Sequence, residues 1–263
     1  MQGHGRERVC FNEAGLWRQI MENTSIIAAS KQAAIRRNMD VIANNIANMN
    51  TTGFKGGKMM FTEHLERSRG GYRIGGDKNS YVRDIATARD ITEGPMISTG
   101  NKLDLAVSGD GYFVVNTATG NNYTRNGNFQ LDNAGQLVTR NGDPLLSDQD
   151  EPFFFSPEDT QITIARDGSV STENGVIGKL NLVTFQNLQD MKPVAGGLHT
   201  TKQQPQPVTN PLILQGMLEG SNVNPIIEMT RMIEAHRSYG SVKDMIQKED
   251  ERVKKMIEEF ARV

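Results

Sequence analysis

Residues 39–55 read Met39-Asp-Val-Ile-Ala-Asn-Asn-Ile-Ala-Asn-Met-Asn-Thr-Thr-Gly-Phe-Lys55, and they combine an apolar helical stripe with four asparagines. When the preceding helical turn is included, apolar residues recur at heptad spacing. They are Ile35, Met39, Ile42, Ile46 and Met49. This spacing predicts a helix with one apolar face. Gly53 offers the positive φ that ends a helix, and Phe54 offers the hydrophobic contact of a C-cap.

The asparagines of this helix are poor interior residues, because their side-chain amides compete with the backbone for hydrogen bonds. A helix that keeps Asn44, Asn45 and Asn48 therefore needs these amides on a surface. We expect them to hydrogen-bond to another chain, since a buried amide without a partner is unfavourable. The segment is thus predicted to be half of an interface between subunits.

A second heptad pattern lies near the C-terminus and is predicted to form the other half. Its apolar positions are Met232, Tyr239, Ile246, Val253 and Phe260. The adjoining position holds Met229 and Ile257 but also charged side chains, which makes a poor seam for an isolated coiled coil. Neither helix can cover its own apolar face. We therefore expect the two helices to pack on each other, within one subunit or between neighbours.

The middle of the chain, residues 101–186, is predicted to be β structure. Short apolar strands such as 103–107 and 112–115 alternate there with turn sequences. The two-residue hairpin signals are Asn126-Gly127, Asn141-Gly142 and Asp167-Gly168, since a type I′ turn needs positive φ at both central residues. A meander or a small barrel-like domain is the predicted arrangement.

Together these patterns predict an α+β fold in which the N- and C-terminal helices form a coiled-coil-like domain, with a central all-β domain inserted between them. The predicted parts are an extension at 1–20, an N-terminal helix at 21–55, an extended linker region with glycine doublets at 56–98, the β domain at 99–190, a proline-containing return linker at 191–222 and a C-terminal helix at 223–263. Two interpretations of residues 1–20 stay open. Either Met21 is the physiological initiator, or the extension is a disordered tail.

Composition and charge exclude several classes of protein. The formal net charge is -2, so no overall field attracts nucleic acid or an anionic membrane. Hydrophobic residues make up 37%, which is low for a compact enzyme and indicates that partner chains supply part of the apolar burial. Cys10 is the only cysteine, so no disulfide framework is predicted. No run of the sequence reaches membrane-spanning length, and the first residues lack the pattern of a cleaved signal peptide, so we expect none.

Candidate catalytic and metal-binding residues form no recognisable constellation. The histidines are dispersed, none has the spacing of metal ligands, and they are His4, His64, His199 and His236. Ser108-Gly-Asp-Gly111 precedes a strand, so it is interpreted as a turn rather than as a phosphate loop. The 132–135 and 141–143 clusters likewise indicate hairpin turns rather than calcium sites. We predict no catalytic residue, no metal and no cofactor.

Several blocks of the sequence resemble the bacterial flagellar rod and hook protein family, in the same order from about Met21 to the C-terminus. They are Ala43-Asn-Asn-Ile-Ala-Asn48 with Thr52-Gly-Phe-Lys55, Thr99-Gly-Asn-Lys-Leu-Asp-Leu-Ala106 with Gly109-Asp-Gly-Tyr-Phe113, Tyr123-Thr-Arg-Asn-Gly-Asn128 with residues 131–135, and Leu218-Glu-Gly-Ser-Asn-Val-Asn224. Residues 224–229 and 232–237 are most similar to the proximal rod members, with the distal rod members next. Gly240 departs from the family pattern, in which an acidic residue is common.

The resemblance implies a structural, non-enzymatic subunit of the flagellar basal-body rod, a hollow helical tube. Its implied partners are other rod proteins, copies of itself and the flagellar type III export apparatus, with no nucleic acid and no membrane insertion. The implied location is the periplasm-spanning rod, reached without a cleaved signal peptide. Two other classes stay open: an exported enzyme or binding module on a rod-like scaffold, and a regulatory coiled-coil adaptor.

Overall fold

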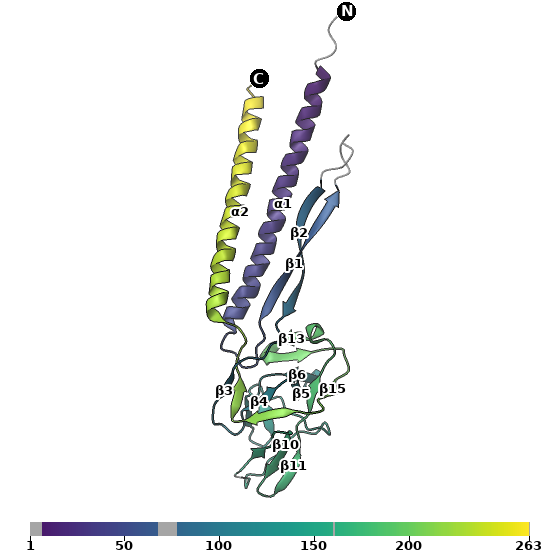
Figure 1. Ribbon diagram of the computed structural model, residues 1–263, viewed down its shortest axis with the longest axis vertical. Coiled ribbons are helices and arrows are strands. Elements are labelled where there is room, and N and C mark those ends of the chain that lie inside the picture. The colour runs from purple at the N-terminus through teal and green to yellow at the C-terminus, as the bar shows by residue number, and fades with distance from the viewer. Residues whose placement is uncertain (1–6, 68–77, 160, 263) are drawn as a thin grey trace, which may run out of the picture. The chain divides into compact units, whose positions relative to one another are not determined.

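The computed structural model describes residues 7–67, 78–159 and 161–262, and Figure 1 shows their path. The chain divides into two compact units. The helical unit consists of the chain up to Asn44, of Lys58–Ala88 and of the chain from Ile226, and the β unit consists of Asn45–Gly57 and Arg89–Pro225. A helix, a set of β sheets and a second helix follow each other in the sequence, which confirms the α+β class.

The helical unit contains two long helices and a two-stranded sheet. The helices are α1 (Glu7–Ala47) and α2 (Pro225–Phe260), and the strands are β1 (Gly57–Arg67) and β2 (Lys78–Arg89). Residues 7–20 of the expected extension are therefore the first part of α1. The β1–β2 sheet stands where an extended linker was expected, because the Met-Met-Phe run at 59–61 favours a strand. The glycine doublets at 70–71 and 75–76 lie outside the described residues.

The apolar stripes of both helices are largely covered. On α1 the heptad positions Ile35, Met39 and Ile46 are half-buried, as is Met49 in the turn after α1, and Ile42 is buried together with Ala28 and Ala34. On α2 the positions Met232, Tyr239, Ile246 and Val253 are half-buried. The side chain of Phe260 lies outside the described part of the chain. The predicted stripes are thus the covered sides of both helices where the structure describes them.

The second position of the α2 seam differs from the one that the sequence indicated. Ala235 and Val242 alternate with the heptad positions of α2 and are buried. Met229 is 49% exposed and Ile257 is 62% exposed. The buried residues beside the stripe are therefore Ala235 and Val242 on its other flank. Alanine adds little volume at such a position, which lets neighbouring elements pack closely.

The β unit contains the remaining strands and two short 3-10 helices. The strands are β3 (Met96–Ser98), β4 (Leu105–Ser108), β5 (Tyr112–Thr117), β6 (Gly120–Thr124), β7 (Phe129–Leu131), β8 (Leu137–Thr139), β9 (Thr163–Ile164), β10 (Ser169–Thr172), β11 (Gly175–Lys179), β12 (Leu182–Thr184), β13 (Lys192–Val194), β14 (Leu198–Thr200), β15 (Gln206–Pro207), β16 (Leu212–Gln215) and β17 (Met217–Glu219), and the 3-10 helices are η1 (Leu188–Asp190) and η2 (Ala195–Gly197). Strands β13 to β17 fall in residues 191–222, where a return linker was expected. Prolines 193 and 207 are compatible with these strands because both lie in edge strands.

The largest sheet has six strands in the order β13-β14-β6-β5-β12-β15, and all of its pairings are antiparallel. One hydrophobic core includes Phe113, Leu137 and Phe153, and a second includes Tyr112 and Tyr123. Successive residues of β5 enter different cores, because alternate side chains of a strand point to opposite faces. The sheet is therefore covered on both faces.

Two of the three predicted hairpin signals are turns between paired segments. Around Asn141-Gly142, the Thr139 N–H donates to Asp143 O at 2.8 Å, and around Asp167-Gly168 the Ala165 N–H donates to Ser169 O at 2.9 Å. Asn126-Gly127 was predicted wrongly, because it connects β6 to β7, which do not pair. A Cβ on Gly127 would lie 1.6 Å from Leu105 O, so this glycine permits a close backbone approach.

Candidate functional site: a buried ionic junction

Three charged side chains meet in the interior of the β unit. Lys55 Nζ lies 2.5 Å from Glu219 Oε1, and Arg125 Nε lies 2.5 Å from Glu219 Oε2. Their exposed fractions are 8% for Lys55, 5% for Arg125 and 1% for Glu219. Each residue comes from a different sequence block: the segment after α1, the segment after β6 and the end of β17. We call these three residues the ionic junction.

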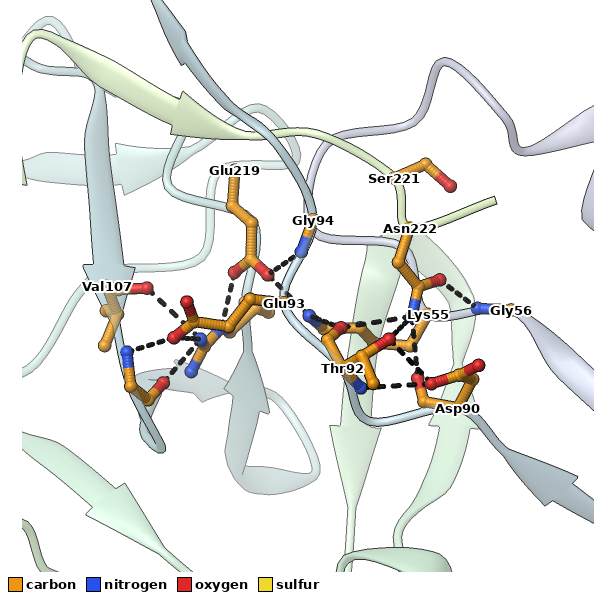
Figure 2. Close-up of polar contacts among 12 residues, drawn as sticks. Lys55, Gly56, Asp90, Thr92, Glu93, Gly94, Val107, Glu219, Ser221 and Asn222 are labelled. Atoms are coloured by element: carbon orange, nitrogen blue, oxygen red, sulfur yellow. Dashed lines mark hydrogen bonds and ion pairs between the residues drawn. The ribbon is translucent and has the colours of Figure 1, made fainter. Parts of the chain in front are cut away.

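Backbone groups complete the hydrogen bonds of the junction, as Figure 2 shows for several of them. Lys55 Nζ donates to Thr92 O at 2.7 Å, and the Gly94 N–H donates to Glu219 Oε1 at 3.0 Å. Arg125 donates to three carbonyl groups of the β4–β5 turn region, those of Val107, Gly109 and Gly111. Buried charges are stable only when they are paired and hydrogen-bonded in this way.

The charges of the junction keep Glu219 ionised. Burial by itself would raise the pKa of the Glu219 carboxyl, but Arg125, Lys55 and the Gly94 N–H together lower this pKa below its ordinary value. Glu93, which is partly exposed, adds a second carboxylate 3.8 Å from Arg125 Nη2. Because both oxygens of Glu219 are engaged, this carboxylate acts as an anchor for chain segments rather than as an acid or base.

The backbone after α1 packs directly on the junction. The Gly53 N–H donates to Glu219 O at 2.8 Å, and Gly53 has φ of 68°. A Cβ at this position would lie 2.7 Å from the carbonyl carbon of Arg125. Both the positive φ and the close approach therefore require glycine. Gly53 was predicted to end the first helix, and in the structure it follows the turn after α1 and packs within the β unit against the Arg125 backbone.

Beside the ionic junction, the Asn222 side chain hydrogen-bonds to the backbone of two other segments (Figure 2). Its Oδ1 accepts from the Gly56 N–H at 2.8 Å, and its Nδ2 donates to Asp90 O at 2.9 Å and to Thr92 O at 3.1 Å. One amide thus joins the segment after α1, the segment after β2 and the segment before α2. The chain enters and leaves the β unit through segments that these bonds tie together.

The asparagines near the end of α1 have contacts within the chain. Asn45 is buried, its Nδ2 donates to Gly57 O at 2.8 Å, and its Oδ1 accepts from the Gly57 N–H at 2.9 Å. Asn48 Oδ1 accepts from Thr51 Oγ1 at 3.2 Å, and Asn44 is exposed. Both ends of the Asn45 amide are therefore used inside the β unit, and a hydrogen bond from Asn45 to another subunit stays a prediction. Phe54 is half-buried in the same segment.

Lys55, Arg125 and Glu219 are the functional residues that sequence reasoning missed. All three stand inside the quoted family-like blocks, but no local pattern pairs residues this far apart in the sequence. One usable signal was Glu219, a carboxylate at the end of the apolar 212–218 run. A charged residue in such a run predicts a buried partner of opposite sign.

The described residues contain no cluster of side chains suited to bind a metal. In that part of the chain, no group of three or more His, Cys, Asp or Glu side chains could hold a metal ion. None of the helices within it is both long and apolar enough to span a membrane.

Three family models match the chain, and each covers one block of the junction. The model "Flagella basal body rod protein" matches residues 27–55, which end at Lys55. The model "Flagellar hook protein FlgE/F/G D1 domain" matches residues 106–172, which include Arg125. The model "Flagellar basal body rod FlgEFG protein C-terminal" matches residues 214–259, which include Glu219. The ionic junction therefore contains one charged residue from each matched segment.

Individual relatives agree with these models. A flagellar basal-body rod protein FlgF from Caulobacter vibrioides is 38% identical over 92% of this chain and 100% of its own length. A FlgF from Mesorhizobium japonicum is 30% identical over 83% of this chain and 90% of its own. A flagellar basal-body rod protein FlgG from Agrobacterium fabrum is 36% identical over 86% of this chain and 94% of its own. On these similarities the chain belongs to the family of flagellar basal-body rod proteins.

Proposed function

We propose that the chain is a structural subunit of the bacterial flagellar basal-body rod and that it assembles through its terminal helices into a torque-transmitting tube. Family membership supports the structural role, which needs no catalytic residue. Subunits that add through two different faces form an open helical assembly rather than a closed ring. Each subunit must then offer surfaces that its own chain leaves uncovered.

The observation that carries the proposal is a second apolar face on α2. Ile226 is 76% exposed, Met229 is 49% exposed and Ile233 is 54% exposed. By the helical period, these residues lie on the opposite side of α2 from the buried Ala235 and Val242. We call Ile226, Met229 and Ile233 the outer stripe. A helix that is apolar on two sides is suited to pack on its own unit with one side and on another subunit with the other.

Pairing of the helices remains part of the proposal. The coiled-coil-like seam would be formed by the α1 positions Ile35, Met39, Ile42, Ile46 and Met49 and by the α2 positions Met232, Tyr239, Ile246, Val253 and Phe260. The half-burial of these positions where they are described supports that arrangement. In this arrangement the ionic junction would fix the segment that follows α1 and the segment that precedes α2, since hydrogen bonds and ion pairs join these two segments.

The partners in this proposal are other rod proteins and further copies of the chain. Export would use the flagellar type III apparatus, and the location would be the periplasm-spanning rod. We place the subunit in the proximal rod, because the FlgF relative from Caulobacter vibrioides matches at 38% over its full length. A distal position is the alternative, since a FlgG relative matches at 36%.

Purified basal bodies provide the test of this function. Mass spectrometry should find the chain in basal bodies detached from the cell, and labelled copies should image at the membrane-proximal end of the rod. Label at the hook-proximal end would favour the distal alternative. Recovery of the chain only in the cytoplasm would contradict the rod function and favour an adaptor.

A further inference from the structure

The sequence contains three Asn-Gly dipeptides, and all of them lie in the described part of the β unit. They are Asn126-Gly127, Asn141-Gly142 and Asn174-Gly175. An asparagine before glycine can lose its side-chain amide without an enzyme. The main-chain nitrogen of the glycine attacks the side-chain carbonyl carbon, and this approach is open because glycine carries no Cβ. The surroundings of each asparagine decide whether the attack can occur in the folded chain.

Asn126-Gly127 is held on both sides of the bond that would react. Asn126 Oδ1 accepts from Thr52 Oγ1 at 2.9 Å and from the Asn128 N–H at 3.1 Å. Gly127 packs on neighbouring backbone, since a Cβ there would lie 1.6 Å from Leu105 O, and its carbonyl accepts from the Leu105 N–H at 2.9 Å. Ring closure between the two residues would have to break these contacts. This dipeptide therefore reacts only when the surrounding β unit opens.

Asn174-Gly175 lies at the tip of the β10–β11 hairpin, where the side chain of Asn174 is bound to another segment. Asn174 Nδ2 donates to Asp159 Oδ1 at 2.8 Å, and Gly175 pairs with Thr172 in the ladder. A hydrogen bond to a carboxylate is stronger than one between neutral groups. It must break before the Asn174 side chain can turn towards the Gly175 nitrogen. Asn174 is thus exposed but restrained.

Asn141-Gly142 also lies in a hairpin turn, but no hydrogen bond among the described residues restrains the Asn141 amide. Asn141 is exposed, and its printed bond is that of the backbone N–H to Thr139 Oγ1 at 3.3 Å. A Cβ on Gly196 would lie 2.0 Å from Asn141 Nδ2, so the amide rests on this glycine by van der Waals contact. No atom lies within 4 Å of a Cβ placed on Gly142. The turn bond from the Gly142 N–H to Thr139 O, at 3.0 Å, is the remaining restraint, and exposed turns open readily.

We propose that Asn141 is a site of slow spontaneous deamidation in the folded chain, whereas Asn126 and Asn174 are protected. The Gly142 nitrogen bonds to Asn141 Cγ, its proton passes through water to the side-chain nitrogen, and that nitrogen leaves as ammonia. One water molecule then opens the cyclic imide, which leaves either aspartate or isoaspartate at this position. One amide and one water thus give one carboxylic acid and one ammonia. The modification is independent of the rod function.

Both products change the turn that follows β8. Each adds one negative charge to the formal net charge of -2. The isoaspartate product also lengthens the main chain by one carbon, because the former side-chain carbon becomes part of the backbone. The Thr139 N–H donates to Asp143 O at 2.8 Å, and this bond depends on the present spacing of the turn. The isoaspartate form should therefore open the turn, while Leu137 and the rest of the core beside it stay packed.

Ageing of the purified full-length chain tests the proposal. The folded chain is kept at mildly alkaline pH, and peptide mass spectrometry compares each site with the same site in the chain unfolded in guanidinium, which gives its intrinsic rate. Relative to these rates, Asn174 should react about 5-fold more slowly than Asn141, the factor that one ordinary hydrogen bond supplies. Asn126 should react at least about 100-fold more slowly, since it requires opening of the β unit. Equal protection of the three sites, or no reaction at Asn141, would overturn the proposal.

Asp159→Ala tests the physical reason for the difference between the two hairpin sites. Removal of the acceptor should accelerate deamidation of Asn174 about 5-fold and leave the rate at Asn141 unchanged. An unchanged rate at Asn174, or the same acceleration at Asn141, would contradict the protection that the proposal assigns to this hydrogen bond. The comparison of sites in the wild-type chain needs no variant, so it decides the proposal even if Asp159→Ala does not fold.

Hydrogen exchange on the aged chain tests the expected opening of the turn. In the isoaspartate fraction, the Thr139 N–H should exchange faster than in the unmodified fraction. The Ala165 N–H, which donates to Ser169 O at 2.9 Å in another hairpin turn, is the matched control and should keep its rate. Equal rates at Thr139 in both fractions would overturn the opening of the turn.

Discussion

Lys55 and Glu219 stand 164 positions apart in the chain, yet Nζ of the lysine lies 2.5 Å from a carboxylate oxygen of the glutamate. Arg125 holds the other oxygen of the same carboxylate. The segment after α1 and the segment before α2 are thereby connected to each other within the β unit. The junction should therefore fold as part of the β unit, whatever the state of the helices.

Glu219→Gln should destabilise the β unit strongly. The substitution keeps the shape of the side chain but leaves Lys55 and Arg125 buried without a buried anion. Removing one member of a buried ionic pair costs about 3–5 kcal/mol. Urea denaturation of the purified chain measures the change. The matched control is Glu93→Gln, whose partly exposed carboxylate should contribute less than about 1 kcal/mol. Equal effects of the two variants would contradict the role of the junction.

Gly53→Ala should be more harmful than alanine at another glycine with positive φ. Gly53 has φ of 68° and Gly142 has φ of 91°, so both substitutions force alanine into a left-handed conformation at about 1–2 kcal/mol. Only at Gly53 would the new Cβ meet backbone, 2.7 Å from the carbonyl carbon of Arg125, since nothing lies within 4 Å at Gly142. In thermal denaturation, Gly53→Ala should have a lower midpoint temperature than Gly142→Ala. The reverse order would count against close packing at Gly53.

The effect of Glu219→Gln should become smaller in acid. The pKa of Glu219 is lowered in the folded chain from the ordinary 4.5, so the unfolded chain binds the proton more readily. The ionised carboxylate thus stabilises the fold above pH 4.5, and this contribution is lost as the pH falls below 4.5. Urea midpoints of wild type and variant should lie further apart at pH 5.5 than at pH 3.5. A constant separation would mean that Glu219 does not titrate with folding.

Local patterns were sufficient to predict the helices and most turns. The heptads around Ile42 and Met232 predicted two helices with a covered side, because apolar residues at this period are typical of an amphipathic helix. Asn141-Gly142 predicted its turn because Gly142 supplies a positive φ of 91°, but the type I′ geometry was predicted wrongly, since Asp150 is the only described residue other than glycine with positive φ. At Gly127 the same dipeptide failed, since glycine is needed there for a close approach to the Leu105 backbone.

Contacts between distant segments could not be predicted in the same way. Nothing in the sequence near Lys55 identifies Glu219 as its partner, because ion pairing depends on topology rather than spacing. Asn45 is a second example of a contact that depends on topology. Its amide was predicted to bind another subunit, and this stays a prediction, whereas its hydrogen bonds to the Gly57 backbone, made after the chain turns back, were not predicted. Ala235 is buried and Met229 is exposed, which was not predicted, because periodicity alone does not say which flank of a stripe is covered.

Ile233→Asp should block assembly and leave the subunit folded. Ile233 is 54% exposed in the outer stripe, so a carboxylate there costs the isolated chain little but would be buried without a partner between subunits. The control is Ser238→Asp, which adds the same charge at an exposed position of α2 outside the stripe. We expect Ile233→Asp cells to lack swimming and Ser238→Asp cells to swim. Circular dichroism should show both purified chains folded like the wild type.

Cross-linking in living cells tests the central claim most directly, namely that the outer stripe of α2 is an assembly face of a rod subunit. A photo-reactive residue would replace Met229, which is 49% exposed, and Ser238 would be replaced as the control. The account predicts that position 229 forms cross-links to a rod protein or to another copy of the chain, and that these appear in purified basal bodies. Cross-links only to proteins outside the flagellum, or none at position 229 in cells that swim, would contradict it.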